Sequence, residues 1–576
     1  MPVSSTVNVG VDRGAHTMRL TYLPPECWHF FVPKERALMM SMTSKEAREK
    51  MEKARAAVDL CLNMKFWFKE RRLDENEKRK ALLEQVGDMA EKYQIESLVL
   101  MNFGMTHADF PRLGATLAKC KELKCLELAQ NDFGIGLRGL IEIVCLTSLT
   151  TLNLKQVNSR SYCTLSLADI VGFFPRLEYL SLEGNNLGLT RIGAAVQEIE
   201  VRPALKFLCL KENFLRVDGL LRVREVLWKC PGLTHLDLSC NTFRSVEMDV
   251  LVGMFSQCTL LSTLNFDGND MDHEDADLTL AKALLPLESL TDLNLQFNRL
   301  GDLLHMGAVL RKCVGLRYLD LGLAVIHDSG ATTLAGVLRT CTEVRVLNLS
   351  TNEIGVAGTE ELSRALGACV DLKGLNMSNN AIRQRGAEAL AGVVGNVRYL
   401  SLSNCGIGAR GVEALAGVEC EDLLSLDVSG NFMNSVGVQA IDGAAGNWPA
   451  LESLSISSNA LGASGMRAVV RVLAKYTNLT SLQLAGNDIQ DEGVEILTHG
   501  LVQCTTLQEL SLTNNNITDA GATCLAGVLP KCTALTELLI SYNVGLGSDG
   551  ERVLREAREG SALAIDVRQR VFRRWV

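Results

Sequence analysis

Three groups of residues in this sequence could carry chemistry: eight histidines, eighteen cysteines and one acidic run. The sequence has no G-x-x-x-x-G-K-[ST] phosphate loop, no H-E-x-x-H zinc motif and no G-x-S-x-G nucleophile turn, and its histidines lack metal-ligand spacing. The acidic run consists of Asp267, Asp270, Asp272, Glu274, Asp275 and Asp277, with His273 among them. It lacks the ligand order and the glycine of an EF-hand, so a solvated loop is favoured over a Ca²⁺ site. We therefore expect no catalytic residue, no metal and no cofactor, and a protein that is not an enzyme.

The cysteines are spaced for burial and not for disulfides. Nine of them stand three residues before an apolar residue that begins a repeated pattern: Cys120, Cys230, Cys258, Cys313, Cys341, Cys369, Cys420, Cys504 and Cys532. Cysteines at such positions behave as small buried hydrophobes. The N-terminus also lacks the apolar core of a signal peptide, so the sequence indicates free thiols in a reducing, cytoplasmic compartment.

Charge and hydropathy limit the class of partner. A formal net charge of -9 and a sequence pI of about 5.6 argue against a general affinity for nucleic acid, which needs clustered lysine and arginine. The sequence has no run of about 18 apolar residues, so we expect no membrane span. The expected partners are other proteins, in a hetero-complex.

One repeating unit positions almost every remaining residue. In the stretch 479–506, the first half has the order of a short strand and a turn, with Leu479, Leu482, Leu484, Asn487 and Ile489. The second half places apolar residues on one helical stripe, at Val494, Leu497, Leu501 and Cys504. We expect Asp491 to cap this helix by accepting a backbone N–H.

The unit recurs along the chain with its register preserved. Seventeen units begin at Ile95, Leu123, Leu149, Leu177, Leu205, Leu233, Leu261, Leu290, Leu316, Val344, Leu372, Val397, Leu423, Leu451, Leu479, Leu507 and Leu535. Eleven of the sixteen spacings are 28 residues and the others are 25, 26 or 29. The ninth position is asparagine in thirteen units, and we expect these buried amides to bond to turn backbone groups. Phe103, Val157, Ala324 and Cys405 replace it, and there we expect local irregularity.

Segments such as LTHLDLSCNTF and LQELSLTNNNITDAGATCLAGVLPKC resemble leucine-rich repeats of the ribonuclease-inhibitor type. The resemblance covers about 95–549 and implies an inner parallel strand and an outer helix in every unit. Strands stack about 4.8 Å apart whereas packed helices need about 10 Å, so the array must bend towards its sheet. The expected fold is an α/β leucine-rich-repeat solenoid. It is a horseshoe of about 17 repeats, with a parallel β-sheet on the concave face and α-helices on the convex face.

The two ends of the chain do not follow the repeat. Residues 1–42, which include Trp28, are expected to form an extended strap on the first repeats, or else an aromatic and proline-rich peptide that docks on a partner. Residues 43–94 are expected to form an α-helical cap, because a solenoid must cover its first apolar face. Residues 550–576 are expected to form a C-terminal cap, with a closing strand over 564–567, and a basic tail.

Two helices are expected in the N-terminal cap. The first begins at the capping pattern of Thr43 and Glu46 and continues through Val58 and Cys61. The second carries an apolar stripe of Leu82, Val86, Met89 and Tyr93.

Two basic aromatic segments flank the array. Trp67 lies in the first, 65–72, and Phe572, Arg573 and Trp575 lie in the C-terminal tail. Either segment could bind an acidic partner. The alternative is that the first is the solvated face of a cap helix and that the tail is a solvated end or folds back on the cap.

Departures from the repeat pattern mark the candidate partner-binding residues, because side chains between the strand leucines point to the concave face. Serines fill many of these positions in the later units. The earlier units carry aromatic, charged and amide side chains there: Lys155, Tyr179, Glu183, Phe207, Lys211, His235, Asp267, Gln296 and Tyr318. Aromatic residues beside lysine or arginine are typical of binding hot spots. The alternative is that these aromatics pack only on each other.

The first functional hypothesis is a non-enzymatic protein-interaction scaffold in a larger cytoplasmic or cytoskeletal assembly. Long repeat chains of this kind resemble structural leucine-rich-repeat subunits of ciliary axonemes, so an axoneme is one such assembly. The second hypothesis is a GTPase-activating protein resembling the Ran GTPase activator, although that family has an acidic tail and this tail is basic. The third is an inhibitor of another enzyme, although the concave face mixes charges of both signs.

Overall fold

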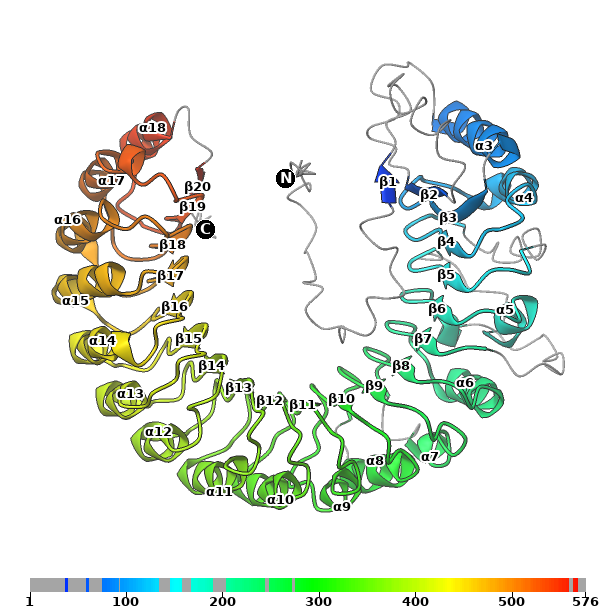
Figure 1. Ribbon diagram of the computed structural model, residues 1–576, viewed down its shortest axis with the longest axis horizontal. Helices are drawn as coiled ribbons and strands as arrows, with labels where there is room; N and C mark the ends of the chain where they lie inside the picture. The colour runs from blue at the N-terminus through cyan, green and yellow to red at the C-terminus, as the bar shows by residue number, and fades with distance from the viewer. Residues whose placement is uncertain are drawn as a thin grey trace, which may run out of the picture.

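The chain forms an open horseshoe, with strands along its inner edge and helices along its outer edge (Figure 1). The computed structural model describes residues 37–39, 58–61, 75–92, 94–133, 146–157, 167–189, 204–243, 248–271, 275–558 and 563–567. The predicted solenoid, with a concave parallel sheet and convex helices, is confirmed.

The inner layer is one parallel sheet, which contains 20 strands in the described part of the chain. The strands are β1 Ala37–Met39, β2 Val58–Cys61, β3 Ile95–Val99, β4 Cys125–Glu127, β5 Thr151–Asn153, β6 Tyr179–Ser181, β7 Phe207–Cys209, β8 His235–Asp237, β9 Thr263–Asn265, β10 Asp292–Asn294, β11 Tyr318–Asp320, β12 Val346–Asn348, β13 Gly374–Asn376, β14 Tyr399–Ser401, β15 Ser425–Asp427, β16 Ser453–Ser455, β17 Ser481–Gln483, β18 Glu509–Ser511, β19 Glu537–Leu539 and β20 Ala564–Asp566. Each strand pairs in parallel with the next strand along the chain. The expected closing strand is present as β20.

The outer layer consists of helices that follow the strands. The α-helices are α3 Glu75–Lys92, α4 Phe110–Leu117, α5 Leu167–Phe173, α6 Val217–Lys229, α7 Met248–Leu251, α8 Ala276–Leu284, α9 Met306–Leu310, α10 Asp328–Leu338, α11 Val356–Leu366, α12 Arg383–Ala391, α13 Gly408–Ala416, α14 Asn434–Gly443, α15 Gly462–Lys475, α16 Gln490–Leu501, α17 Asp519–Ala526 and α18 Ser548–Ala557. Short 3₁₀ turns lie at η3 His107–Asp109, η5 Leu187–Leu189, η7 Ala444–Gly446 and η8 Leu529–Lys531.

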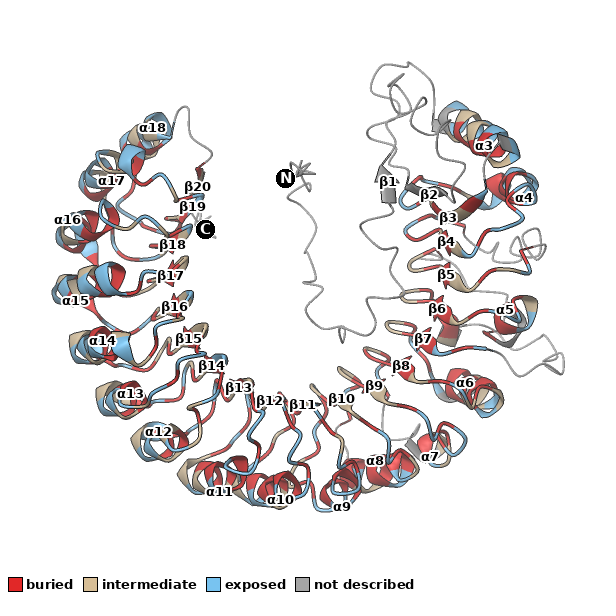
Figure 2. Cartoon of the chain, in the orientation of Figure 1, coloured by how far each residue is buried: buried red, intermediate tan, exposed pale blue. Residues whose placement is uncertain are grey.

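The core lies between the two layers, where buried residues line the inner sides of strands and helices (Figure 2). In the unit that begins at Leu479, the strand leucines Leu482 and Leu484 are fully buried, as are Val494 and Leu497 of α16. The cysteines of the described chain are free thiols, and most are buried. Burial raises the pKa of the Cys230 thiol to about 12, so it stays protonated and behaves as an apolar side chain.

The predicted asparagine ladder is present. Asn487 is buried, and its Oδ1 accepts a hydrogen bond from the backbone N–H of Asn459 at 2.7 Å. Its Nδ2 donates to the backbone oxygens of Ile456 and Leu484, both at 3.0 Å. One amide therefore ties its own turn to the turn of the preceding unit.

The ladder lacks its side-chain amide at the substituted units, as the sequence predicts for Phe103, Val157 and Ala324, and it has a further gap at Asn298. In the four units without asparagine, the backbone N–H of the substituted residue still donates to the asparagine of the following unit, at 3.0 Å in each case. The further gap is at Oδ1 of Asn298, which is buried and has no hydrogen-bond partner among the described residues. The unit before Asn298 is 29 residues long, and we attribute the missing bond to this extra residue, which shifts the donating turn.

The N-terminal cap differs from the prediction at Val58–Cys61. This segment is strand β2, with Leu60 opposite Leu98 of β3, so the first predicted helix does not continue through Val58 and Cys61. A short run with alternating apolar residues fits both helix and strand periods, and the open edge of β3 offers backbone groups that only a strand satisfies. The rest of the predicted first helix lies outside the described residues.

The second cap helix is present as α3, on which Leu82, Val86 and Met89 are buried as predicted. Tyr93 lies outside the described residues. Strand β1 lies within the segment predicted as an extended strap, and the remainder of that segment is also outside the described part of the chain.

Asp491 caps a helix, but not the predicted one. It lies inside the first turn of α16, and its Oδ1 accepts hydrogen bonds from the backbone N–H groups of Thr518 at 2.9 Å and Gly521 at 3.0 Å. These groups belong to the N-terminus of α17, in the next unit. Asp328 and Asp519 make the same kind of contact with the helices that follow them. The aspartate therefore joins neighbouring units on the convex side, as the asparagine does near the strands.

Candidate protein-binding face

Aromatic side chains from three neighbouring strands meet on the concave face. Parallel pairing places Tyr179 of β6 beside Phe207 of β7, and Phe207 beside His235 of β8. The Tyr179 and Phe207 rings stack with centroids 4.4 Å apart, and the centroids of Phe207 and His235 are 6.0 Å apart. Their side chains are 8%, 7% and 8% exposed in that order. The aromatics therefore pack on each other, and little of any of the three residues remains exposed.

Charged side chains border this stack. Nζ of Lys155 lies 2.9 Å from Oε1 of Glu183. Burial alone would lower the pKa of the Lys211 ammonium, but the carboxylates of Glu183 and Asp237 hold it above its usual value. Lys211 is therefore a fixed positive charge between two acidic neighbours.

Carboxylates dominate the next part of the concave face. The strand positions that face it on β8 to β12, with the turns that follow, carry Asp237, Asp267, Asp292 and Asp320, and the one lysine or arginine there is Arg299. Burial, reinforced by Asp320, raises the pKa of the Asp267 carboxyl to about 6. Burial also raises the pKa of Asp320, against a hydrogen bond from Nδ2 of Asn348 at 2.9 Å. The positive charge of Lys211 opposes the rise in the pKa of Asp267.

The structure therefore arranges the nine array residues predicted to bind a partner as two groups on one face. Lys155, Tyr179, Glu183, Phe207, Lys211 and His235 form the first group. Asp267, Gln296 and Tyr318 form the second, in which Oη of Tyr318 donates to Oδ2 of Asp320 at 3.1 Å. The predicted residues of the two ends, Trp28, Trp67, Phe572, Arg573 and Trp575, lie outside the described residues.

In the later units, serine hydroxyls on the concave face hydrogen-bond to one another. Oγ of Ser378 lies 2.7 Å from Oγ of Ser401, and Oγ of Ser429 lies 2.7 Å from Oγ of Ser455. Ser401 also donates to Oδ2 of Asp427 at 3.2 Å. Because these hydroxyls already have partners, this half of the face offers less to a ligand than the first half.

Sequence reasoning missed an apolar row at the edge of the face. Backbone φ is positive at the eighth position of every unit, from Asn102 to Tyr542. Glycine and asparagine suit that conformation, but two neighbouring units carry Phe297 and Leu323 there. Val325, two residues further on, also has a positive φ, of 59°. Comparing the eighth positions of all units would have found this row, once that position is known to be left-handed.

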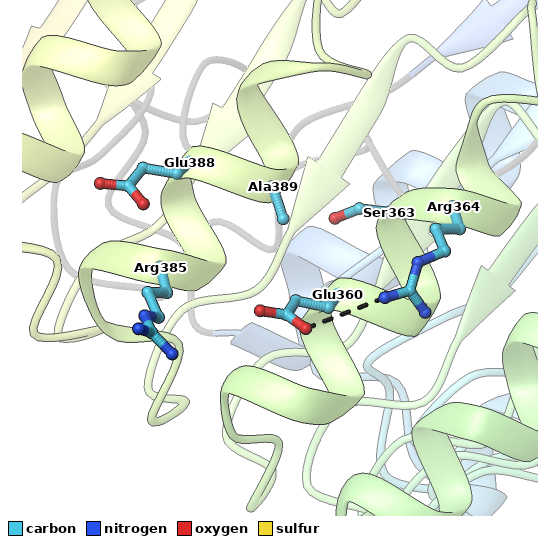
Figure 3. A pocket seen from close by; sticks show the side chains of 6 residues that line it. All are labelled: Glu360, Ser363, Arg364, Arg385, Glu388 and Ala389. Atoms are coloured by element: carbon cyan, nitrogen blue, oxygen red, sulfur yellow. Dashed lines mark ion pairs between the residues drawn. The ribbon is translucent and has the colours of Figure 1, made fainter.

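A groove of about 630 Å³ lies on the convex side, between α11 and α12 (Figure 3). It is lined by Glu360, Ser363, Arg364, Arg385, Glu388 and Ala389. Its position coincides with a 25-residue unit, whose helix α12 is two residues shorter than α11. Arg364 and Glu360 form an ion pair at 3.9 Å, so the charges of the lining largely balance. We assign no ligand to this groove.

The described residues contain no group of three or more histidine, cysteine or acidic side chains placed to hold a metal ion. Within the same residues, no helix combines the length and the apolar character needed to cross a membrane.

Comparison with known proteins identifies the repeats. A family model described as leucine-rich repeat matches residues 313–335, 368–391, 396–416, 449–470, 476–497 and 503–526. A mouse protein, "NACHT, LRR and PYD domains-containing protein 4C", is 27% identical over 234 residues, which are 38% of this chain. The matched part is 22% of the mouse protein, so the chain spans about a fifth of the length of this relative.

Two solved structures are similar at 17% sequence identity. One is an internalin, InlF, from Listeria monocytogenes, with a TM-score of 0.36 over 76% of this chain and 94% of the internalin. The other is a leucine-rich-repeat protein from Leptospira interrogans, with a TM-score of 0.37 over 84% of this chain and 97% of that protein. The matched repeats and the strand, turn and helix of each unit together show that the chain contains leucine-rich repeats, with a unit length consistent with the ribonuclease-inhibitor type.

Proposed function

We propose that this protein is a non-enzymatic interaction scaffold that holds another protein on its concave face between Lys155 and Tyr318. The observation that carries the proposal is the gathering of aromatic and charged side chains on consecutive strands, from β5 to β11, of a sheet that is otherwise repetitive. Each of these strands is hydrogen-bonded on both sides. The surface is therefore formed before binding, which reduces the entropy lost on association.

We propose that the partner mainly contacts the side chains around the aromatic stack and contacts the stacked rings less. Tyr179 and Phe207 fix the centre by packing on each other, and His235 extends it. The half-buried groups at its border offer the polar contacts of a hot spot: Lys155, Glu183, Lys211, Asp267, Gln296 and Tyr318.

We further propose that the scaffold belongs to a larger cytoplasmic or cytoskeletal assembly, of which a ciliary axoneme is one example. The basic aromatic segments that flank the array support additional contacts there, through Trp28, Trp67, Phe572, Arg573 and Trp575. Proximity labelling and cross-linking of the full chain in cells would name the neighbours. Labelling of cytoskeletal or axonemal proteins is the expected result, and recovery of none of them would contradict this assignment.

The binding face is tested with residues that can change without breaking the stack. We expect the double variant Lys155→Met and Gln296→Ala to bind the cross-linked partner at least about tenfold more weakly. Methionine keeps the aliphatic stem of the lysine, so the melting temperature should move by no more than about 2 °C. Binding is measured by titration of the purified full chain.

The control is the double variant Ser453→Ala and Ser481→Ala, on the serine-rich half of the same face. It should bind the partner as the unmodified chain does. Equal binding by both double variants would contradict a docking site between Lys155 and Tyr318. Stimulated GTP hydrolysis by a purified small GTPase would instead favour the activator hypothesis.

A further inference from the structure

The unit that begins at Leu535 presents apolar side chains where the units before it present polar ones. Its strand β19 ends in Leu539, which is partly exposed, whereas every strand from β8 to β18 ends in aspartate, asparagine, serine or glutamine. In the turn that follows β19, Tyr542 is 42% exposed and Val544 is 88% exposed. Glu537 of β19 and Glu509 of β18 lie beside them, at matching positions of the sheet. We call these five residues the end surface.

The end surface lies in a part of the sheet that has no cations. In the last five units, the strand-and-turn segments 423–434, 451–462, 479–490, 507–518 and 535–546 contain no lysine or arginine. The cations of the described part of these units lie in helices or at their ends: Arg467, Arg471, Lys475, Lys531, Arg552, Arg555 and Arg558. The strand side of these units is therefore open to a positively charged segment.

The two glutamates of the end surface are accessible and form no ion pair with any described residue. Glu537 is exposed, and Glu509 is half-buried. Oε1 and Oε2 of Glu509 accept hydrogen bonds from neutral groups only, Nε2 of Gln483 at 3.0 Å and Oγ of Ser481 at 3.1 Å. Strand pairing holds the two carboxylates side by side, where like charges repel each other. An arginine placed between them would relieve this repulsion.

The chain itself supplies a segment of complementary composition next to the end surface. Residues 568–576 follow directly after Val567, and they contain four arginines, Phe572 and Trp575 but no acidic residue. The strand before them, β20, is paired with β19. Nine extended residues span about 30 Å, whereas β20 and β18 are two strand spacings apart, about 10 Å. The segment is therefore long enough to reach the whole end surface.

We propose that residues 568–576 dock on the end surface of their own chain. The arginines pair with the two glutamates, and the aromatic side chains pack on Leu539 and Val544. Attachment through β20 gives the segment a high effective concentration at this surface, which favours it over a separate basic peptide. The inference goes beyond the scaffold site, which lies on other strands. A neighbour that binds the basic tail in an assembly must first displace it from the end surface.

The test is limited digestion of the native full chain with trypsin, with mass spectrometry to follow cleavage after the tail arginines. Docking shields these arginines. The double variant Glu509→Gln and Glu537→Gln should therefore lose its tail at least about fivefold faster than the unmodified chain. Cleavage within the array is measured in the same digest and should be equal for the two chains, which separates release of the tail from unfolding.

A matched control is available at Glu495, which is exposed on α16 in the outer layer. Glu495→Gln removes the same charge far from the sheet and should leave tail cleavage unchanged. Val544→Ser removes apolar surface but no charge, and it should speed tail cleavage about twofold. Raising the salt concentration from about 0.1 M to about 1 M shortens the Debye length from about 10 Å to about 3 Å. The difference between the unmodified chain and the double glutamine variant should then disappear.

Equal tail cleavage in the unmodified chain and the double glutamine variant would overturn the inference, as would the same acceleration in Glu495→Gln. Tail cleavage should not change when the chain is diluted tenfold, because the segment and the surface belong to one molecule. Protection that is lost on dilution would place the tail on a second copy and would also overturn the inference. None of these results bears on the scaffold site, which the variants of Lys155 and Gln296 test separately.

Discussion

A single asparagine in each regular unit closes its own turn and holds the preceding unit. Asn487→Ala would leave the buried N–H of Asn459 and the oxygen of Ile456 without their partners. Unpaired buried backbone groups are expensive, so we expect the free energy of unfolding to fall by about 3 kcal/mol. Chemical denaturation of the purified chain measures this loss.

Asn478 provides the comparison, because it is an exposed asparagine in the same region. Its Nδ2 donates to the oxygen of Pro449 at 3.0 Å, within reach of solvent. Water replaces that bond when it is removed, so Asn478→Ala should lower the free energy of unfolding by less than about 1 kcal/mol. Similar losses of unfolding free energy for the two variants would show that a ladder asparagine stabilises the fold no more than an exposed asparagine does.

The carboxyl of Asp267 makes stability depend on pH. Its pKa is about 6 in the folded chain and lower in the unfolded chain, because burial disfavours its charge. The folded state therefore binds more protons between about pH 4 and 6, and stability falls as the pH rises through that range. Asp267→Asn should stabilise the chain by about 1–2 kcal/mol at pH 7, after allowance for solvent screening, and should have no effect below about pH 4. Thermal unfolding at several pH values checks this, and a pH-independent difference would contradict it.

At the scale of elements, neighbouring helices are joined by one aspartate. Oδ1 of Asp491 accepts two backbone N–H groups at the N-terminus of α17, and Oδ2 accepts the hydroxyl of Thr518 at 2.6 Å. A Cβ added at Gly521 would lie 2.4 Å from Oδ1 of Asp491, so the glycine makes room for this contact. We expect Asp491→Ala to lower the free energy of unfolding by about 1–2 kcal/mol and to speed amide exchange in α17. The exposed neighbour Glu492 is the control, since Glu492→Ala should leave exchange in α17 unchanged.

Elements within a unit could be predicted from the sequence, whereas contacts between units could not. Each strand and helix has its own periodicity, and the ninth-position asparagines mark the turns. The local pattern predicts that Asp491 caps its own helix, because it contains no information about the helix in the next unit. The sequence pattern predicts helix at Val58–Cys61, because so short an apolar run fits both the helix and the strand period. Pairing with the edge of β3 makes the segment a strand. The left-handed eighth position, and with it the apolar row, follows from sheet pairing beyond the strands.

At the scale of the whole molecule, the sequence predicts which residues face the concave side. It does not predict how those residues group along the arc. Alternation along each strand identified Tyr179, Phe207 and Asp267 as inward-facing residues. Only pairing in space shows that the first two form a stack and that the third lies among other carboxylates. The array therefore presents an aromatic group, an acidic group and a serine-rich half in succession along one arc, and a partner that covers several strands can contact more than one of them.

The two halves of the arc should also differ in stability. Units stack in one dimension, so local stability depends on how well each unit packs against its neighbours. Helices α7 and α9 have four and five residues, whereas α10 to α18 have eight to fourteen. Shorter helices bury less apolar surface between units.

We therefore expect the array to open first around β8 to β10, where the short helices lie. Native-state hydrogen exchange with increasing denaturant should give lower opening free energies for strand amides in β8 to β10 than for those in β14 to β18. Equal opening free energies in both regions would mean that the arc unfolds as one cooperative unit, with the short helices compensated by contacts elsewhere in their units.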